Sequence, residues 1–227
     1  MTDKWTMGPK FKEYLNMNFG LVYRYYWLML VLSCLGLGIA NYVLLIPTLT
    51  KLYSQTLYHK QACLYQSVPV SSFETVLVKT VVGVIGFLIP AVITLGITVL
   101  KSVLDGSQLE LYEQMKEMGL IFHTGAGTVL YMLNLVMASF LICGIALFGV
   151  AVGNRVRGNR EKKPNTATAV LVIGVMLLVL YGITWIMEQI QFASPLLREI
   201  LGLVGCTIGA GGLFWLNVRA LDKWYSI

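Results

Sequence analysis

Few side chains in this sequence have the types and spacing that chemistry requires. The two histidines, His59 and His123, stand far apart outside the apolar runs, and the four cysteines follow no metal-ligand or disulfide pattern. The chain has no cluster of acids and bases for proton transfer and no G-x-x-x-x-G-K-[ST] phosphate loop. We therefore expect no catalytic residue, no metal site and no bound cofactor in this chain.

The composition is typical of a membrane protein. The 227-residue chain is 57% hydrophobic and only 12% charged, with a mean hydropathy of +0.73, whereas a soluble domain carries about 25% charged residues. A run of about 20 apolar residues crosses a bilayer as a helix. Five runs approach that length and contain no Asp, Glu, Lys or Arg: 25–46, 81–100, 128–152, 167–187 and 200–216. The sequence predicts an all-α, polytopic helical membrane protein with about five spanning helices.

The absence of charge inside these runs excludes several functions. A charged side chain in the hydrocarbon costs about 3 kcal/mol or more and is kept mainly where ions or protons move. Its absence argues against a proton-coupled transporter, a pump and an intramembrane protease. Asn41 and Asn134 are the strongest polar residues inside the runs, and each is expected to hydrogen-bond a neighbouring helix. Pro90 should kink the second run, either as a static feature or as a hinge near a translocation path.

Small residues indicate how the last run packs. Its four glycines share one helical face, and two of them form a GxxxG pair: Gly202, Gly205, Gly209 and Gly212. Small residues let helix backbones approach closely in lipid, where no hydrophobic force drives association. We expect a contact inside the molecule first, with a dimer seam as the alternative.

Basic residues divide the connections into two groups. Ten Lys and Arg residues lie in 48–80, in 153–166 and after residue 216, whereas 101–127 and 188–199 together hold three. Because basic residues favour the cytoplasmic side, the first group and the C-terminus are expected in the cytoplasm, with the chain in the cell membrane. This sorting accounts for the net charge of +6 without nucleic-acid binding.

The N-terminal segment conflicts with this topology. Residues 1–24 predict an amphipathic helix at the membrane interface, and 25–227 form one transmembrane domain. Five crossings with a cytoplasmic C-terminus place the first segment outside, although it carries four basic residues: Lys4, Lys10, Lys12 and Arg24. Either this helix lies on the outer face, or the run 25–46 re-enters without crossing, with Gly36, Gly38 and Pro47 as break points. A plain spanning helix is the preferred interpretation.

The stretch "LYQSVPVSSFETVLVK", residues 64–79, is too polar for the bilayer core and too organised for a simple linker. A proline disfavours helix at the residue before it, so Val68-Pro69-Val70 predicts an extended or turn segment. Ser71 or Ser72 can then cap a helix, and Glu74 stands at the capping-box spacing from Ser71. This capped helix runs into the apolar run 81–100. A protein that pushed on it would therefore move the span.

This stretch resembles the segment that follows the second membrane helix in ABC-2-type transporter permeases, including small bacterial membrane subunits. Six residues match the family pattern: Tyr65, Val68, Pro69, Val70, Ser71 and Lys79. In that family the segment is a coupling helix that docks on an ATPase subunit. The resemblance covers about residues 25–227, with one departure. The family usually has six spans, two of them before the motif, and this chain has one apolar run there.

The resemblance implies the permease subunit of an ATP-binding-cassette transporter that exports peptide, antibiotic or lipid-like cargo. ATP and Mg would be bound by a separate ATPase subunit, and a second permease subunit, identical or paralogous, would complete the transporter. The expected ATPase-coupling loop comprises Tyr65, Ser67, Val68, Pro69, Val70, Ser71, Ser72, Glu74 and Lys79. The alternative is a non-transporting membrane protein, such as an immunity or sensor subunit or a stand-alone pore or scaffold.

Overall fold

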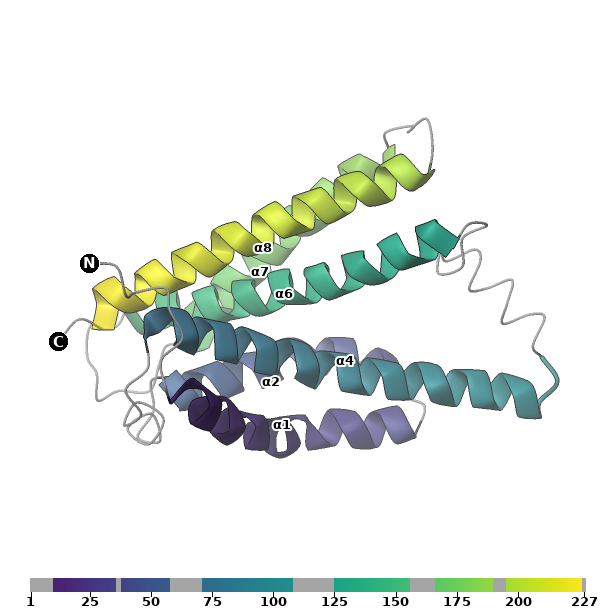
Figure 1. The fold of residues 1–227 in the computed structure, drawn as a ribbon, viewed down its shortest axis with the longest axis horizontal. Coiled ribbons are helices and arrows are strands. Elements are labelled where there is room, and N and C mark those ends of the chain that lie inside the picture. The colour runs from purple at the N-terminus through teal and green to yellow at the C-terminus, as the bar shows by residue number, and fades with distance from the viewer. Residues whose placement is uncertain are drawn as a thin grey trace.

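The structure is a computed structural model that describes residues 10–35, 38–57, 71–107, 125–155, 166–189 and 195–225. Every regular element in these ranges is an α-helix, which confirms the predicted all-α class. The helices lie side by side in one elongated bundle (Figure 1). They are α1 (Phe11–Cys34), α2 (Gly38–Leu57), α4 (Ser72–Leu104), α6 (Gly125–Arg155), α7 (Thr166–Gln189) and α8 (Pro195–Tyr225).

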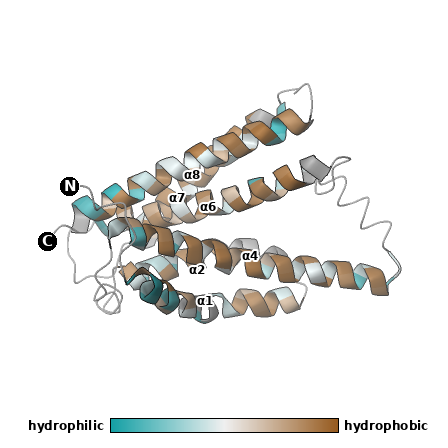
Figure 2. Cartoon of the chain, in the orientation of Figure 1, coloured by the Kyte–Doolittle hydropathy of each residue, from teal (hydrophilic) through white to brown (hydrophobic). Residues whose placement is uncertain are grey.

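Four of these helices are long and apolar enough to cross a membrane: α4, α6, α7 and α8. They contain the predicted runs 81–100, 128–152, 167–187 and 200–216, and they extend beyond them. The 33 residues of α4 measure about 50 Å, which exceeds the hydrocarbon thickness of about 30 Å. Polar residues gather where α1 begins and α8 ends (Figure 2). The structure thus supports a helical membrane protein.

The apolar run 25–46 does not form the single spanning helix that we expected. α1 ends at Cys34 and α2 begins at Gly38, and α2 runs back beside α1 (Figure 1). Each arm carries about ten residues of the run, or about 15 Å of helix. That is half of the hydrocarbon thickness. Pro47 lies inside α2 without ending it. α1 continues through residue 24, so the part of the predicted interfacial segment that lies in α1 and the first arm are one helix.

The α1–α2 hairpin covers only the first part of α4. Its contacts with α4 include Lys79, Gly83 and Gly86. Farther along, α4 has exposed apolar side chains on several faces: Val92, Leu95, Val99, Leu100, Val103 and Leu104. The hairpin therefore ends partway along the helix that it packs against.

The second half of the bundle is built around α6. Gly149 of α6 lies against Ile173 of α7, and the other side of α6 packs along α8. Cys143 of α6 lies beside Gly83 of α4, which joins the two halves. Pro90 is buried within α4, and the helix continues through it. Its role as a hinge stays a prediction.

The hairpin resolves the conflict between the basic N-terminal segment and the predicted topology. The beginning of α1 and the end of α8 lie at the same end of the bundle (Figure 1). That end carries most of the basic residues that the structure describes: Lys10, Lys12, Lys51, Arg155, Arg219 and Lys223. A hairpin that returns to the end where it began therefore agrees with the positive-inside rule, which five crossings did not.

We expect positions 12 and 223 to be accessible from the same side of the membrane. Single cysteines at Lys12, Lys223 and Asp105, all exposed, are introduced separately into a chain whose native cysteines are replaced. Labelling of intact and opened cells with an impermeant maleimide then assigns each position to a side. Lys12→Cys and Lys223→Cys should react together, and Asp105→Cys should react from the opposite side. If Lys12→Cys and Asp105→Cys reacted from the same side, residues 25–46 would cross the membrane once, as the sequence predicted.

Candidate functional site

The start of α4 has the capping box that the sequence predicted. The backbone N–H of Ser71 donates to Glu74 Oε2 at 2.8 Å, and the N–H of Glu74 donates to Ser71 Oγ at 3.2 Å. Ser71 has extended backbone angles, with φ −72° and ψ 160°, so it is the cap and Ser72 is the first helical residue. Reciprocal bonds of this kind satisfy two of the free donors at a helix start. The beginning of α4 is therefore a fixed point.

Part of the predicted coupling loop lies outside the described residues. These positions are Tyr65, Ser67, Val68, Pro69 and Val70. The described part, from Ser71 to Lys79, belongs to one helix that continues to Leu104. The expected direct connection between the capped start and the span is thus confirmed.

Lys79 joins α4 to the hairpin. Its side chain is completely buried, and Nζ donates to Asn18 Oδ1 of α1. The amide nitrogen of Asn18 donates to the Tyr14 carbonyl at 2.7 Å, which turns the amide oxygen toward the lysine. Nζ also lies 5.8 Å from the centre of the Tyr14 ring, within the range of a cation–π contact. A buried lysine thus ties α1 to the second turn of α4.

Two tyrosines of the hairpin pack on glycines of α4. The Tyr53 hydroxyl of α2 donates to the Lys79 carbonyl at 3.2 Å, and burial raises the pKa of this phenol well above its ordinary value, so it stays a donor. A Cβ at Gly83 would overlap with this hydroxyl, and a Cβ at Gly86 would overlap with the Tyr26 ring. Both glycines are required for close approach. The hairpin is therefore fitted to this part of α4.

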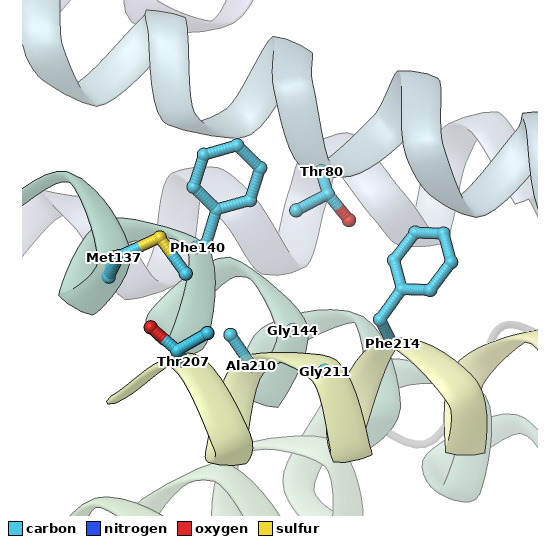
Figure 3. Close-up of a pocket in the computed structure, with 8 residues that line it drawn as sticks. All are labelled: Thr80, Met137, Phe140, Gly144, Thr207, Ala210, Gly211 and Phe214. Carbon is cyan, nitrogen blue, oxygen red and sulfur yellow. The ribbon is translucent and has the colours of Figure 1, made fainter. Parts of the chain in front are cut away.

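The start of α4 also contacts the other half of the bundle. The rings of Phe73 and Phe214 lie 5.4 Å apart in an edge-to-face arrangement, a geometry that aromatic pairs favour. Phe214 is also a wall of a cavity between α4, α6 and α8 (Figure 3). The capped start of α4 thus contacts the hairpin through Lys79 and α8 through Phe73.

Sequence reasoning identified Ser71, Glu74 and Lys79 but missed the residues that meet them. Asn18, Tyr26 and Tyr53 come from segments that are distant in sequence, so no local pattern connects them to α4. The one available signal was the set of basic residues at the N-terminus, which conflicted with five crossings.

The predicted helix-packing residues have mixed outcomes. Asn134 bonds a neighbouring helix as expected, because its amide nitrogen donates to the carbonyl and to Oε2 of Glu199, both at 2.8 Å. The side chain of Asn41 lies outside the described residues. Gly202 faces Asn134 and Gly209 faces Leu141, both on α6, whereas Gly205 and Gly212 have open space at the Cβ position. Half of the glycine face therefore makes the internal contact.

No group of three potential metal ligands occurs among the described residues. Comparison of the chain with protein-family models, with curated proteins and with solved structures found no match. The fold defines the class of the protein, a polytopic α-helical membrane protein, and α1, α2 and α8 all contact the first two turns of α4.

Proposed function

We propose that this chain is the membrane-spanning permease subunit of an ATP-binding-cassette transporter, driven by a separate ATPase subunit. The observation that carries the proposal is the capped start of α4, which continues without interruption into a helix of membrane-spanning length. A force applied just before Ser71 acts on a rigid element, because the capping box fixes the helix start. That force is transmitted along the span.

Two contacts would spread this movement through the bundle. Lys79 holds Asn18, so the hairpin would follow α4. Phe73 lies against Phe214, so α8 would respond at the same time. A subunit that alternates between two arrangements moves packed elements together rather than deforming gradually. The start of α4 is suited to that role.

The remaining parts of the proposal follow from the resemblance to ABC-2-type permeases. The basic end of the bundle, with the segment before Ser71 and the C-terminus, would face the cytoplasm of the cell membrane. ATP and Mg would be bound by the partner ATPase. A second permease subunit, identical or paralogous, would complete a path for exported peptide, antibiotic or lipid-like cargo. The uncharged spans favour cargo with a substantial apolar part.

The test is purification from the native cell through a C-terminal tag, followed by an assay for ATP hydrolysis by co-purifying subunits. In one variant Val68-Pro69-Val70 is changed to three glycines. In the matched control the same change is made at Gln108-Leu109-Glu110, in the connection that follows α4. We expect wild type and control to retain an ATPase subunit and the first variant to lose it.

Other outcomes favour the alternatives. Absence of an ATPase subunit from folded, membrane-inserted wild type would contradict the proposal and favour a stand-alone pore or scaffold. Retention of an ATPase subunit without transport of cargo into vesicles would indicate an immunity or sensor subunit.

A further inference from the structure

The cavity between α4, α6 and α8 has a volume of about 270 Å³ and is open on one side. Thr80 lies on its α4 side, Phe140 on its α6 side, and Ala210 and Phe214 on its α8 side (Figure 3). Glycines leave this space, because Gly211 carries no side chain to fill it and a Cβ there would meet nothing within 4 Å. Close-packed interiors contain few voids larger than a water molecule, so this space is more than an ordinary packing defect.

The lining determines which ligand the cavity can hold. It contains no charged side chain, and its polar groups are the hydroxyls of Thr80 and Thr207. Thr207 Oγ1 donates to the Leu203 carbonyl of its own helix at 2.7 Å, so its proton is already used. A charged or peptide ligand would lose its hydration here without gaining partners, and water needs two to four polar partners to stay bound. An alkyl chain has no hydration to lose and needs no polar partners, so it is suited to this lining.

The position of the cavity agrees with this chemistry. All three helices around it contain membrane-length apolar stretches, and Thr80 directly follows Lys79 near the basic end of the bundle. An amphipathic molecule could therefore insert its chain from the leaflet at that end and leave its polar group at the surface. The Phe214 wall touches Phe73 at the start of α4, so a ligand here lies against the element that the proposed ATPase would push.

We propose that this cavity binds the alkyl chain of an amphipathic, lipid-like molecule. The chain could belong to a single-chain amphiphile or to a bilayer phospholipid, which share this chemistry. The assignment of that molecule as cargo rests on the proposed function, whereas binding itself requires no partner subunit.

The test compares two neighbouring glycines that both have open space at the Cβ position. Both glycines are exposed, but Gly211 lines the cavity and Gly212 is absent from the lining. The purified chain is placed in phosphatidylcholine nanodiscs with either palmitic acid or phosphatidylcholine that carries a diazirine in the alkyl chain. After irradiation, mass spectrometry measures labelling at Thr80, Phe140 and Phe214, with exposed Leu178 of α7 as the lipid-facing reference.

We expect strong labelling of the cavity residues in wild type and in Gly212→Leu. In Gly211→Leu the new side chain occupies the cavity, and the loss of about two buried methylenes of ligand corresponds to about tenfold less labelling. Leu178 should be labelled equally in all three proteins, which also reports that the variants are folded and inserted.

Labelling with palmitic acid alone would identify a single-chain amphiphile, and labelling with phosphatidylcholine would identify a bilayer lipid. Either result supports an alkyl-chain site. Equal labelling of the cavity in wild type and Gly211→Leu, or labelling of Leu178 without the cavity, would overturn it. Because the measurement uses one purified chain, a positive result stands even if no ATPase subunit co-purifies, and the two proposals fail separately.

Discussion

Replacement of Gly86 by leucine is expected to separate the α1–α2 hairpin from α4 and to lower the free energy of unfolding by about 1–3 kcal/mol. A Cβ at this position would overlap with the Tyr26 ring, which is fully buried. An aromatic ring held in a close-packed interior cannot move aside without displacing the helix that carries it. The gain in helix propensity from glycine to leucine, about 1 kcal/mol, offsets only part of this cost.

Gly96 is the matched control for this prediction. It lies on the same helix and is exposed, and a Cβ there would meet nothing within 4 Å. Gly96→Leu should therefore leave the apparent melting temperature in detergent unchanged or slightly raised, whereas Gly86→Leu should lower it. Adding Tyr26→Ala to Gly86→Leu makes room for the new side chain, so part of the loss should be recovered through non-additive coupling. Equal effects of the two glycine substitutions would mean that the hairpin does not pack on α4.

The spans and the capping box were readable from the sequence because both depend on local pattern. A run of about 20 uncharged residues favours a membrane helix, and four of the five runs lie in such helices. The Ser71–Glu74 spacing forms its two hydrogen bonds within one turn of α4. Neither feature needs information from a distant part of the chain.

The hairpin was not readable for the opposite reason. Hydropathy averages over the run 25–46 and is the same for one crossing and for two half-length arms. Gly38 is a weak break signal, and Pro47, the stronger one, lies inside α2. What separates the two arrangements is the fit of Tyr26 and Tyr53 to Gly83 and Gly86, which depends on tertiary packing. The cavity could not be predicted from the sequence either, because its three walls come from helices that no sequence pattern relates.

The second large effect is expected at the contact between Lys79 and Asn18. Asn18→Leu removes the acceptor of a hydrogen bond from a buried amine and should cost about 1–3 kcal/mol. Changing both residues, as Asn18→Leu with Lys79→Met, replaces a buried polar pair by apolar groups of similar length. Such exchanges are often nearly neutral. The double variant should therefore be more stable than Asn18→Leu alone.

A double-mutant cycle of unfolding in detergent checks this prediction, with Lys51→Met as the control because Lys51 is exposed on α2. The control should change stability by no more than about 0.5 kcal/mol. Additive losses from the two single changes would show that the pair is not coupled. The double variant also separates structure from function, because it is expected to fold without the lysine. If it keeps the ATPase subunit and loses transport, Lys79 transmits movement from α4 to the hairpin. If it keeps both the ATPase subunit and transport, Lys79 contributes only to the packing of α4 on the hairpin.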